Sequence, residues 1–207
     1  MEHIGTTKED IQQAAAILRG GGLIAFPTET YYGLGVDPFN EASLKRLFAV
    51  KNRPSVKPVL VLVPSRNDIA RMSNAVPGVA EQLMDRFWPG PLTMVFPARS
   101  ELSVMLTGNT GTIGIRISSN PVAQALQKVF GGPVTATSAN RSGGNAAVTE
   151  AEVRENFGGT IDMVLSGGRT PGGKPSTIIG FSGDRIECIR EGCIKYSEIA
   201  EVIRAGG

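Results

Sequence analysis

The chain has 207 residues, of which 41% are hydrophobic and 19% are charged, the composition of an ordinary globular domain. A formal net charge of +2 is too small to indicate a nucleic-acid-binding protein by itself. The single histidine, His3, falls in an N-terminus that we expect to fray, which argues against a serine–histidine triad, and with two cysteines it leaves too few ligands for a structural zinc site. The sequence begins with no signal-peptide pattern and contains no apolar run of membrane-spanning length, so we expect a cytoplasmic protein without a membrane partner.

Capping residues and apolar periodicity predict the helices. Thr6 and Glu9 form a capping box, Asn40 is a favourable N-cap, and Thr149 with Glu152 forms a second capping box. The apolar residues that follow these caps recur at the spacing of one helix face. The predicted helices cover residues 7–19, 41–51, 68–72, 77–87, 121–130, 150–157 and 197–204.

Short apolar runs between the helices predict the strands. They cover residues 23–26, 58–63, 92–96, 112–117, 133–137, 163–165, 177–181 and 185–189. Strands and helices alternate through the first two-thirds of the chain, and strands cluster towards its end. We therefore expect an α/β fold in a single domain over residues 1–207, with one large, twisted, mixed β-sheet flanked by helices. Cys188 and Cys193 are expected to be buried free thiols.

Three cations lie close together near the predicted end of the second helix. Lys51 and Arg53 are two residues apart, and Lys57 follows after Pro54. Because the helix dipole favours positive charge at a C-terminus, a solvated helix end is one interpretation. The other is a phosphate site, since arginine presents a planar fork to pairs of oxygens and lysine a mobile point charge.

A serine and an asparagine follow the strand predicted at residues 133–137. Ser138 and Asn140 could form a structural turn with their own backbone, as these residue types often do. They could equally donate hydrogen bonds to a phosphate or a sugar. The chain has no Walker-type phosphate loop and no complete dinucleotide fingerprint, so any nucleotide must be held by another arrangement.

Two arginines at strand positions require partners. Arg116 lies within an otherwise apolar strand, and Arg190 ends another. Because a buried, unpaired arginine is costly, Arg116 needs a carboxylate from the protein or from a ligand. Glu29 is the internal candidate, since residues 28–30 directly follow a predicted strand, where a crevice can form.

The order of these motifs resembles the YrdC/Sua5/TsaC family over roughly residues 10–195. The motifs that carry the resemblance are residues 26–35, 51–54, 88–93, 112–116, 138–143 and 176–177. The chain departs from the family pattern at Leu62, where many members carry a histidine, and at Ala146, where a serine is frequent. Longer members carry a second domain, and this chain resembles the short, single-domain type.

The resemblance implies a twisted YrdC-like α/β domain and the activity of a threonylcarbamoyl-AMP synthase. Such an enzyme is a nucleotidyltransferase that joins L-threonine, bicarbonate and ATP and releases pyrophosphate. The resemblance also implies that Mg²⁺ arrives with ATP rather than on a protein metal site, and that a partner transferase complex passes the threonylcarbamoyl group to adenosine 37 of tRNA. Two alternatives stay open: a non-catalytic module that binds double-stranded RNA or tRNA, and a hydrolase acting on a carbamoyl-adenylate.

The same resemblance assigns roles to individual residues. Lys51 and Arg53 would be catalytic and meet the triphosphate. The implied nucleotide-binding residues are Arg53, Lys57, Thr112, Ser138, Asn140 and Arg190. The implied threonine-binding residues are Thr30, Arg116, Ala136 and Ser176, with the threonine carboxylate as the partner of Arg116.

Overall fold

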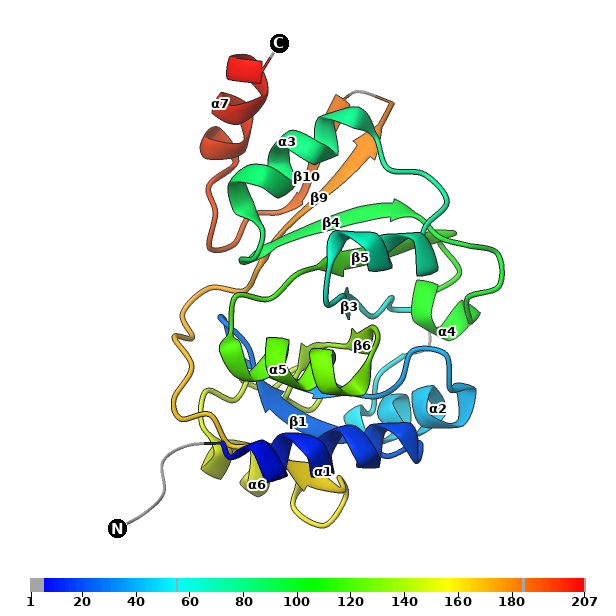
Figure 1. Ribbon diagram of the computed structural model, residues 1–207, viewed down its shortest axis with the longest axis vertical. Helices are drawn as coiled ribbons and strands as arrows, with labels where there is room; N and C mark the ends of the chain where they lie inside the picture. Colours follow the sequence, from blue (N-terminus) through cyan, green and yellow to red (C-terminus); the bar gives the residue numbers. More distant parts are fainter. Residues whose placement is uncertain (1–5, 55, 184, 207) are drawn as a thin grey trace.

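The computed structural model describes residues 6–54, 56–183 and 185–206, in which two β-sheets are flanked by helices (Figure 1). This arrangement confirms the α/β class and the mixed strand pairing. The single large sheet that we expected is divided in two. The helices are α1 (Lys8–Arg19), α2 (Glu41–Lys51), η1 (Arg66–Arg71), α3 (Gly78–Phe87), α4 (Val104–Thr107), α5 (Pro121–Phe130), α6 (Glu150–Phe157) and α7 (Tyr196–Gly206).

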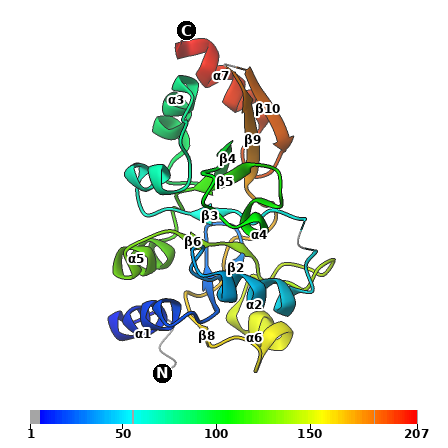
Figure 2. The same cartoon turned by 90° about the vertical axis from the view of Figure 1, so that its right-hand side faces the viewer.

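The smaller sheet has four strands. Their order is β7 (Thr137–Ser138), β2 (Tyr32–Gly35), β1 (Ile24–Pro27) and β8 (Met163–Val164). The central strand β1 pairs antiparallel with β2 and parallel with β8. Figure 2 shows α1 and α5 on one side of this sheet and α2 and α6 on the other. Both faces are therefore covered, which explains why β1 is apolar at successive positions.

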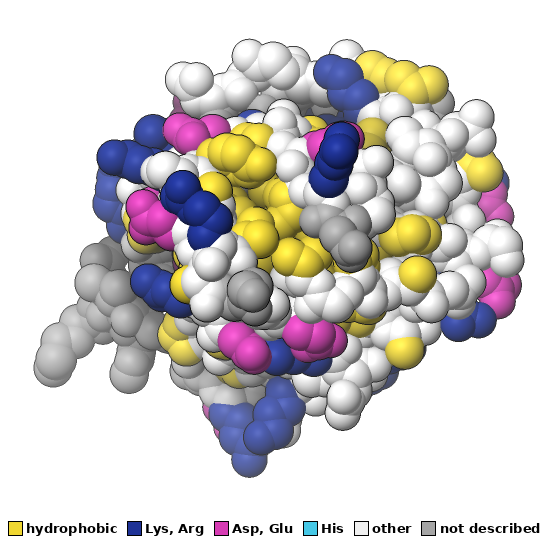
Figure 3. All heavy atoms as spheres, turned by 90° about the horizontal axis from the view of Figure 1, so that it is seen from above, with side chains coloured by type: hydrophobic (Ala, Val, Ile, Leu, Met, Phe, Trp, Pro, Cys, Tyr) yellow, Lys and Arg dark blue, Asp and Glu magenta, His cyan; other side chains and the backbone are white. Residues whose placement is uncertain are grey.

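The larger sheet has six strands. Their order is β10 (Arg185–Arg190), β9 (Thr177–Ser182), β4 (Leu92–Pro97), β5 (Thr112–Arg116), β3 (Val61–Leu62) and β6 (Val134–Thr135). β4 pairs parallel with β9 and antiparallel with β5, so the sheet is mixed. Its far end lies beside α3 and α7 (Figure 1). Seen from above in Figure 3, hydrophobic side chains gather in the middle of this end of the molecule, with Lys and Arg side chains around them.

One extended segment, residues 134–138, takes part in both sheets. Its first part, β6, pairs with β3 in the larger sheet, and its second part, β7, pairs with β2 in the smaller one. Only Ala136 separates the two strands, and its N–H donates to the carbonyl of Leu60 at 3.0 Å. The N–H of Thr135 donates to the carbonyl of Val36, which also bonds the segment to the chain beyond β2. The two sheets therefore meet at Ala136.

Two clusters of buried hydrophobic residues form the core. The larger lies between the two sheets and helices α2, α3, α4, α6 and α7, and the smaller lies beneath α1 and α5. Strand alternation divides neighbouring residues between them: Val61 belongs to the larger cluster and Leu62 to the smaller. Leu62 is fully buried, so this departure from the family pattern is a core position. None of the helices in the described residues is long and apolar enough to cross a membrane.

The structure corrects several sequence predictions. The first capping box is formed by Thr7 and Asp10, one residue later than expected: the N–H of Asp10 donates to Thr7 Oγ1 and the N–H of Thr7 to Asp10 Oδ2. The predicted strand at residues 58–63 is regular only over β3, because Val59 bonds instead to the carbonyl of Leu106 in α4. That short helix α4 was not predicted.

The prediction of buried thiols was wrong. Cys188 lies on the edge strand β10, which is mostly exposed, and Cys193 is exposed in the loop that follows. Five of the six residues of β10 are exposed, and only Ile186 is partly buried, so both faces of this edge strand are open to solvent at Cys188. The expected fraying of His3 concerns a residue outside the described part of the chain.

We predict that Leu62→Ala lowers the free energy of unfolding by about 2–5 kcal/mol, because it removes buried methyl groups and leaves a cavity beneath α1 and α5. Chemical denaturation measures this loss. Val104→Ala is the matched control, since Val104 is 65% exposed and its truncation should change stability by less than about 0.5 kcal/mol. Equal, small losses in both variants would contradict the placement of Leu62 in the core.

Candidate functional site

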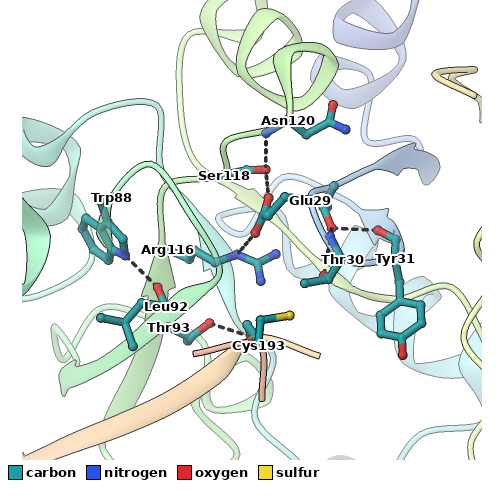
Figure 4. Close-up of polar contacts among 12 residues, drawn as sticks. Glu29, Thr30, Tyr31, Trp88, Leu92, Thr93, Arg116, Ser118, Asn120 and Cys193 are labelled. Atoms are coloured by element: carbon teal, nitrogen blue, oxygen red, sulfur yellow. Dashed lines mark hydrogen bonds and ion pairs between the residues drawn. The ribbon is translucent and has the colours of Figure 1, made fainter. Parts of the chain in front are cut away.

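A cavity of about 600 Å³ lies where the two sheets meet. Its walls come from β2, β4, β5, β7, β9, β10 and the connections between them. One part is apolar, formed by Val59, Leu60, Val95, Ile178 and Ile189. The rest carries hydroxyl and guanidinium groups, several of which Figure 4 shows. A mainly apolar cavity of this size with a few convergent polar groups suits a small organic ligand with anionic groups.

Most of the residues singled out from the sequence meet in this cavity. Those that line it are Thr30, Arg53, Thr112, Arg116, Ala136, Ser138, Ser176 and Arg190. Lys51, Lys57 and Asn140 are not among the lining residues. Of the two departures from the family pattern, Ala146 lines the cavity and Leu62 does not.

Arg53 reaches the cavity from the turn that ends α2. The C-cap of this helix, Asn52, has a φ of 49°, in the left-handed region that asparagine tolerates better than most residues. The Arg53 guanidinium donates from Nε to the carbonyl of Lys57 at 3.3 Å and from Nη2 to the carbonyl of Pro58 at 2.8 Å. Lys57 thus contributes its backbone to the site. Burial lowers the pKa of Arg53 from its ordinary value.

Lys51 connects the two polar signatures that lie far apart in the sequence. Its Nζ donates to the carbonyl of Ser138, to the carbonyl of Asn140 at 2.7 Å and to Asn140 Oδ1 at 3.4 Å. The side chain is almost fully buried. Burial, and secondarily the Arg53 charge, lower the pKa of Lys51 to about 7, while the three oxygen acceptors favour the ammonium form.

The turn at residues 138–140 is both structural and part of the cavity wall. Ser138 Oγ donates to Asn140 Oδ1 at 2.6 Å, and Asn140 Nδ2 donates to the carbonyls of Arg141 and Gly144. Asn140 therefore shapes its own loop, as the structural interpretation of this motif expects. Ser138 lines the cavity, so the turn also presents a hydroxyl to any ligand there.

Arg116 is buried and has an internal partner, the carboxylate of Glu29. Glu29 Oε1 lies 3.2 Å from Arg116 Nε, and Ser118 Oγ donates to Glu29 Oε2. Burial lowers the pKa of Arg116, and the Glu29 charge opposes that shift. Figure 4 shows the two terminal guanidinium nitrogens directed away from Glu29 and towards the side of Thr30. In the described residues they make no hydrogen bond, although Arg116 lines the cavity.

Ser176 is held by two neighbours that also line the cavity. Thr93 Oγ1 donates to Ser176 Oγ at 3.0 Å, and Arg190 Nη2 donates to the Ser176 carbonyl at 2.8 Å. Gly192 lets the chain after β10 approach the backbone of Ser176 closely, because a Cβ there would lie 2.1 Å from the carbonyl oxygen of Pro175 and 2.7 Å from that of Ser176. Burial, and then the Arg116 charge, lower the pKa of Arg190.

Sequence reasoning missed the roles of two lining threonines. Thr93 belongs to the motif at residues 88–93, but its bond to Ser176 spans 83 residues and has no local signal. Thr110 lies in a stretch that was expected to be irregular, and its Oγ1 is 2.8 Å from Thr112 Oγ1. Thr110 is only two residues from Thr112, which was predicted to bind the nucleotide, and this proximity could have identified Thr110 as a lining residue.

The charge of the cavity favours anions. Three arginines line it, whereas none of the described lining residues is Asp, Glu or His. The described part of the chain also has no cluster of three such residues or cysteines that could hold a metal ion. Without a lining carboxylate or imidazole, the chemistry open to this site is the binding and positioning of anionic groups and the stabilisation of negative charge.

Comparisons with known proteins show which family the sequence resembles. The Sua5/YciO/YrdC family model, described as telomere recombination, matches residues 16–192. Threonylcarbamoyl-AMP synthase from Pyrococcus abyssi is 36% identical over 193 residues, which cover 93% of this chain and 57% of that protein. The enzyme of the same name from Vibrio cholerae is 40% identical over 172 residues, covering 82% of this chain and 92% of that protein.

Solved structures give the same result. The crystal structure of P. abyssi Sua5 complexed with L-threonine superposes with a TM-score of 0.92 at 36% identity, over 95% of this chain and 58% of that one. The chain thus spans little more than half the length of the P. abyssi protein. Residues 16–192, which the family model matches, include both sheets and every residue that lines the cavity. The chain therefore belongs to the Sua5/YciO/YrdC family.

Proposed function

We propose that the protein is a threonylcarbamoyl-AMP synthase, which makes threonylcarbamoyl-AMP and pyrophosphate from L-threonine, bicarbonate and ATP. The observation that carries the proposal is the cavity itself, in which three arginines and several hydroxyls face one space without an opposing lining carboxylate. It is supported by the similarity to proteins of that name and to a structure that holds L-threonine.

The amino acid is assigned to the end of the cavity that contains Arg116. The two terminal nitrogens of this guanidinium suit the threonine carboxylate, because arginine can bind both carboxylate oxygens at once. Thr30, Ala136 and Ser176 complete that end of the cavity. The small side chain of Ala136 leaves room there, at the point where the sheets meet.

ATP, as its magnesium complex, is assigned to the other end. Arg53 and the turn at Ser138 would form one side and Thr112 another, while Arg190, which donates to Ser176, would lie between the two ligands. The charge of Lys51 lies directly behind the turn, and Lys57 and Asn140 shape the loops that support it. The positive charge of Lys51 and Arg53 would offset the negative charge that develops on the phosphates.

The chemistry needs no protein nucleophile. The threonine amine and bicarbonate form a carbamate and water, and a carbamate oxygen attacks the α-phosphorus while pyrophosphate leaves. The attacking oxygen is already anionic, so positioning and charge stabilisation supply the catalysis. Use of the product in tRNA modification, by a separate transferase, is a further part of this proposal.

We predict that Arg53→Ala lowers kcat on the order of a hundredfold, because one charge-stabilising donor lowers the activation barrier by about 3 kcal/mol. The assay follows pyrophosphate release and the mass of the nucleotide product, with threonine or bicarbonate omitted in turn. Arg204→Ala, an exposed arginine on α7, is the matched control.

The wild-type protein should accumulate the adenylate only when both co-substrates are present. If the protein converts added threonylcarbamoyl-AMP to AMP and forms no threonylcarbamoyl-AMP from the three substrates, it is a hydrolase instead. RNA binding without either reaction would indicate the non-catalytic module.

We also predict that nucleotide binding takes up a proton through Lys51. With a pKa of about 7, Lys51 is largely neutral at pH 8, and the nearby phosphate charge would raise that pKa and return the group to its ammonium form. Calorimetric titration with magnesium–ATP at pH 8, in two buffers of different ionisation enthalpy, should show uptake of up to about one proton. Lys51→Met should abolish it, and equal enthalpies in both buffers for the wild type would contradict the prediction.

A further inference from the structure

The Arg116 guanidinium is divided between the protein and the cavity. Its Nε lies 3.2 Å from Glu29 Oε1 in an ion pair that lacks hydrogen-bond geometry, and both side chains are at least nine-tenths buried. Its terminal nitrogens point away from Glu29 (Figure 4), and Arg116 lines the cavity. This division is unusual for a buried arginine–carboxylate pair, because such pairs favour two parallel bonds. Something must therefore keep Glu29 from taking a second guanidinium nitrogen.

Ser118 is the residue that holds the second oxygen of Glu29. Ser118 Oγ is fully buried and donates to Glu29 Oε2. Ser118 Oγ also accepts the N–H of Asn120 at 3.2 Å. Because this contact uses a lone pair, the hydroxyl hydrogen of Ser118 is free to point at Glu29. Neither Ser118 nor Glu29 lines the cavity.

Ser118 is in turn fixed by the start of α5. Asn120 is the N-cap of this helix, and its Oδ1 accepts the N–H groups of Val122 and Ala123. Gln124 Nε2 donates to the Ser118 carbonyl at 2.8 Å. The position of Glu29 is therefore set by a helix terminus rather than by a mobile loop.

We propose that Ser118 and Glu29 are positioning residues that hold Arg116 by one edge and keep its terminal nitrogens available for the carboxylate of an amino-acid substrate. The proposal rests on the proposed function, which assigns threonine to this end of the cavity. Without the Ser118 hydroxyl, Glu29 Oε2 loses its partner and the carboxylate turns towards the terminal nitrogens of Arg116. It then competes with the substrate carboxylate for the same two donors.

The test is Ser118→Ala, with kinetics and threonine binding measured on the full chain. The KM for threonine should rise about tenfold, whereas kcat at saturating threonine and the KM for ATP should stay within about twofold of the wild type. Ser118→Ala combined with Glu29→Gln should bring the threonine KM back to within about threefold of the wild type, because a neutral amide competes less well for Arg116. Ser43→Ala is the matched control, a buried serine whose hydroxyl donates to the Gly21 carbonyl and which does not line the cavity.

The outcomes separate the two proposals. If the wild type binds no threonine, the proposed function fails and the positioning role fails with it. If the wild type binds threonine and folded Ser118→Ala binds it equally well, only the positioning role is overturned. If Ser118→Ala does not fold, the variant that combines Ser118→Ala with Glu29→Gln is measured instead. A tenfold rise of the threonine KM in that double variant, or an equal loss of ATP binding, would also overturn the positioning role.

Discussion

The rest of the structure depends on one constraint: residues 134–138 must pair in two sheets at once. β6 fixes this segment against β3, β7 fixes it against β2, and Ala136 lies between. Because β3 also pairs with β5, the same segment sets the distance between the turn at Ser138 and the guanidinium of Arg116. The cavity is the space that this crossing of sheets leaves open, and both sheets contribute residues to its walls.

Buried positive charge gives the cavity its preference for anionic ligands. Arg53, Arg116 and Arg190 all have lowered pKa values because burial disfavours their charged forms, and Glu29 supplies the one carboxylate that pairs with Arg116. A buried charge without a partner is costly, so an anionic ligand stabilises the site as well as occupying it. Lys51 lies behind the cavity wall, where its Nζ donates to carbonyl oxygens of the turn. The cavity thus couples the binding of anions to the stability of the loops that form it.

Much of the fold and of the site could be predicted because the signals were local. Helices α3 and α5 begin and end within a residue of their expected limits, since caps and apolar spacing lie within each helix. The division into two sheets was missed because strand pairing between residues 33 and 138 has no local signature. The burial of Lys51 was missed for the same reason, as its acceptors lie 87 and 89 residues away. The internal partner of Arg116, Glu29, was foreseen as one alternative. An arginine within an otherwise apolar strand is expected to be buried, and a buried arginine needs a partner.

In the proposed function, an amino acid and a nucleotide occupy one continuous cavity at the crossing of the sheets. The most direct measurement is displacement from the protein loaded with labelled L-threonine and a labelled, non-hydrolysable ATP analogue. Added threonylcarbamoyl-AMP should release both labels together, with one equivalent sufficient for each protein molecule. Release of the nucleotide while threonine stays bound would place the two ligands in separate sites and contradict the account.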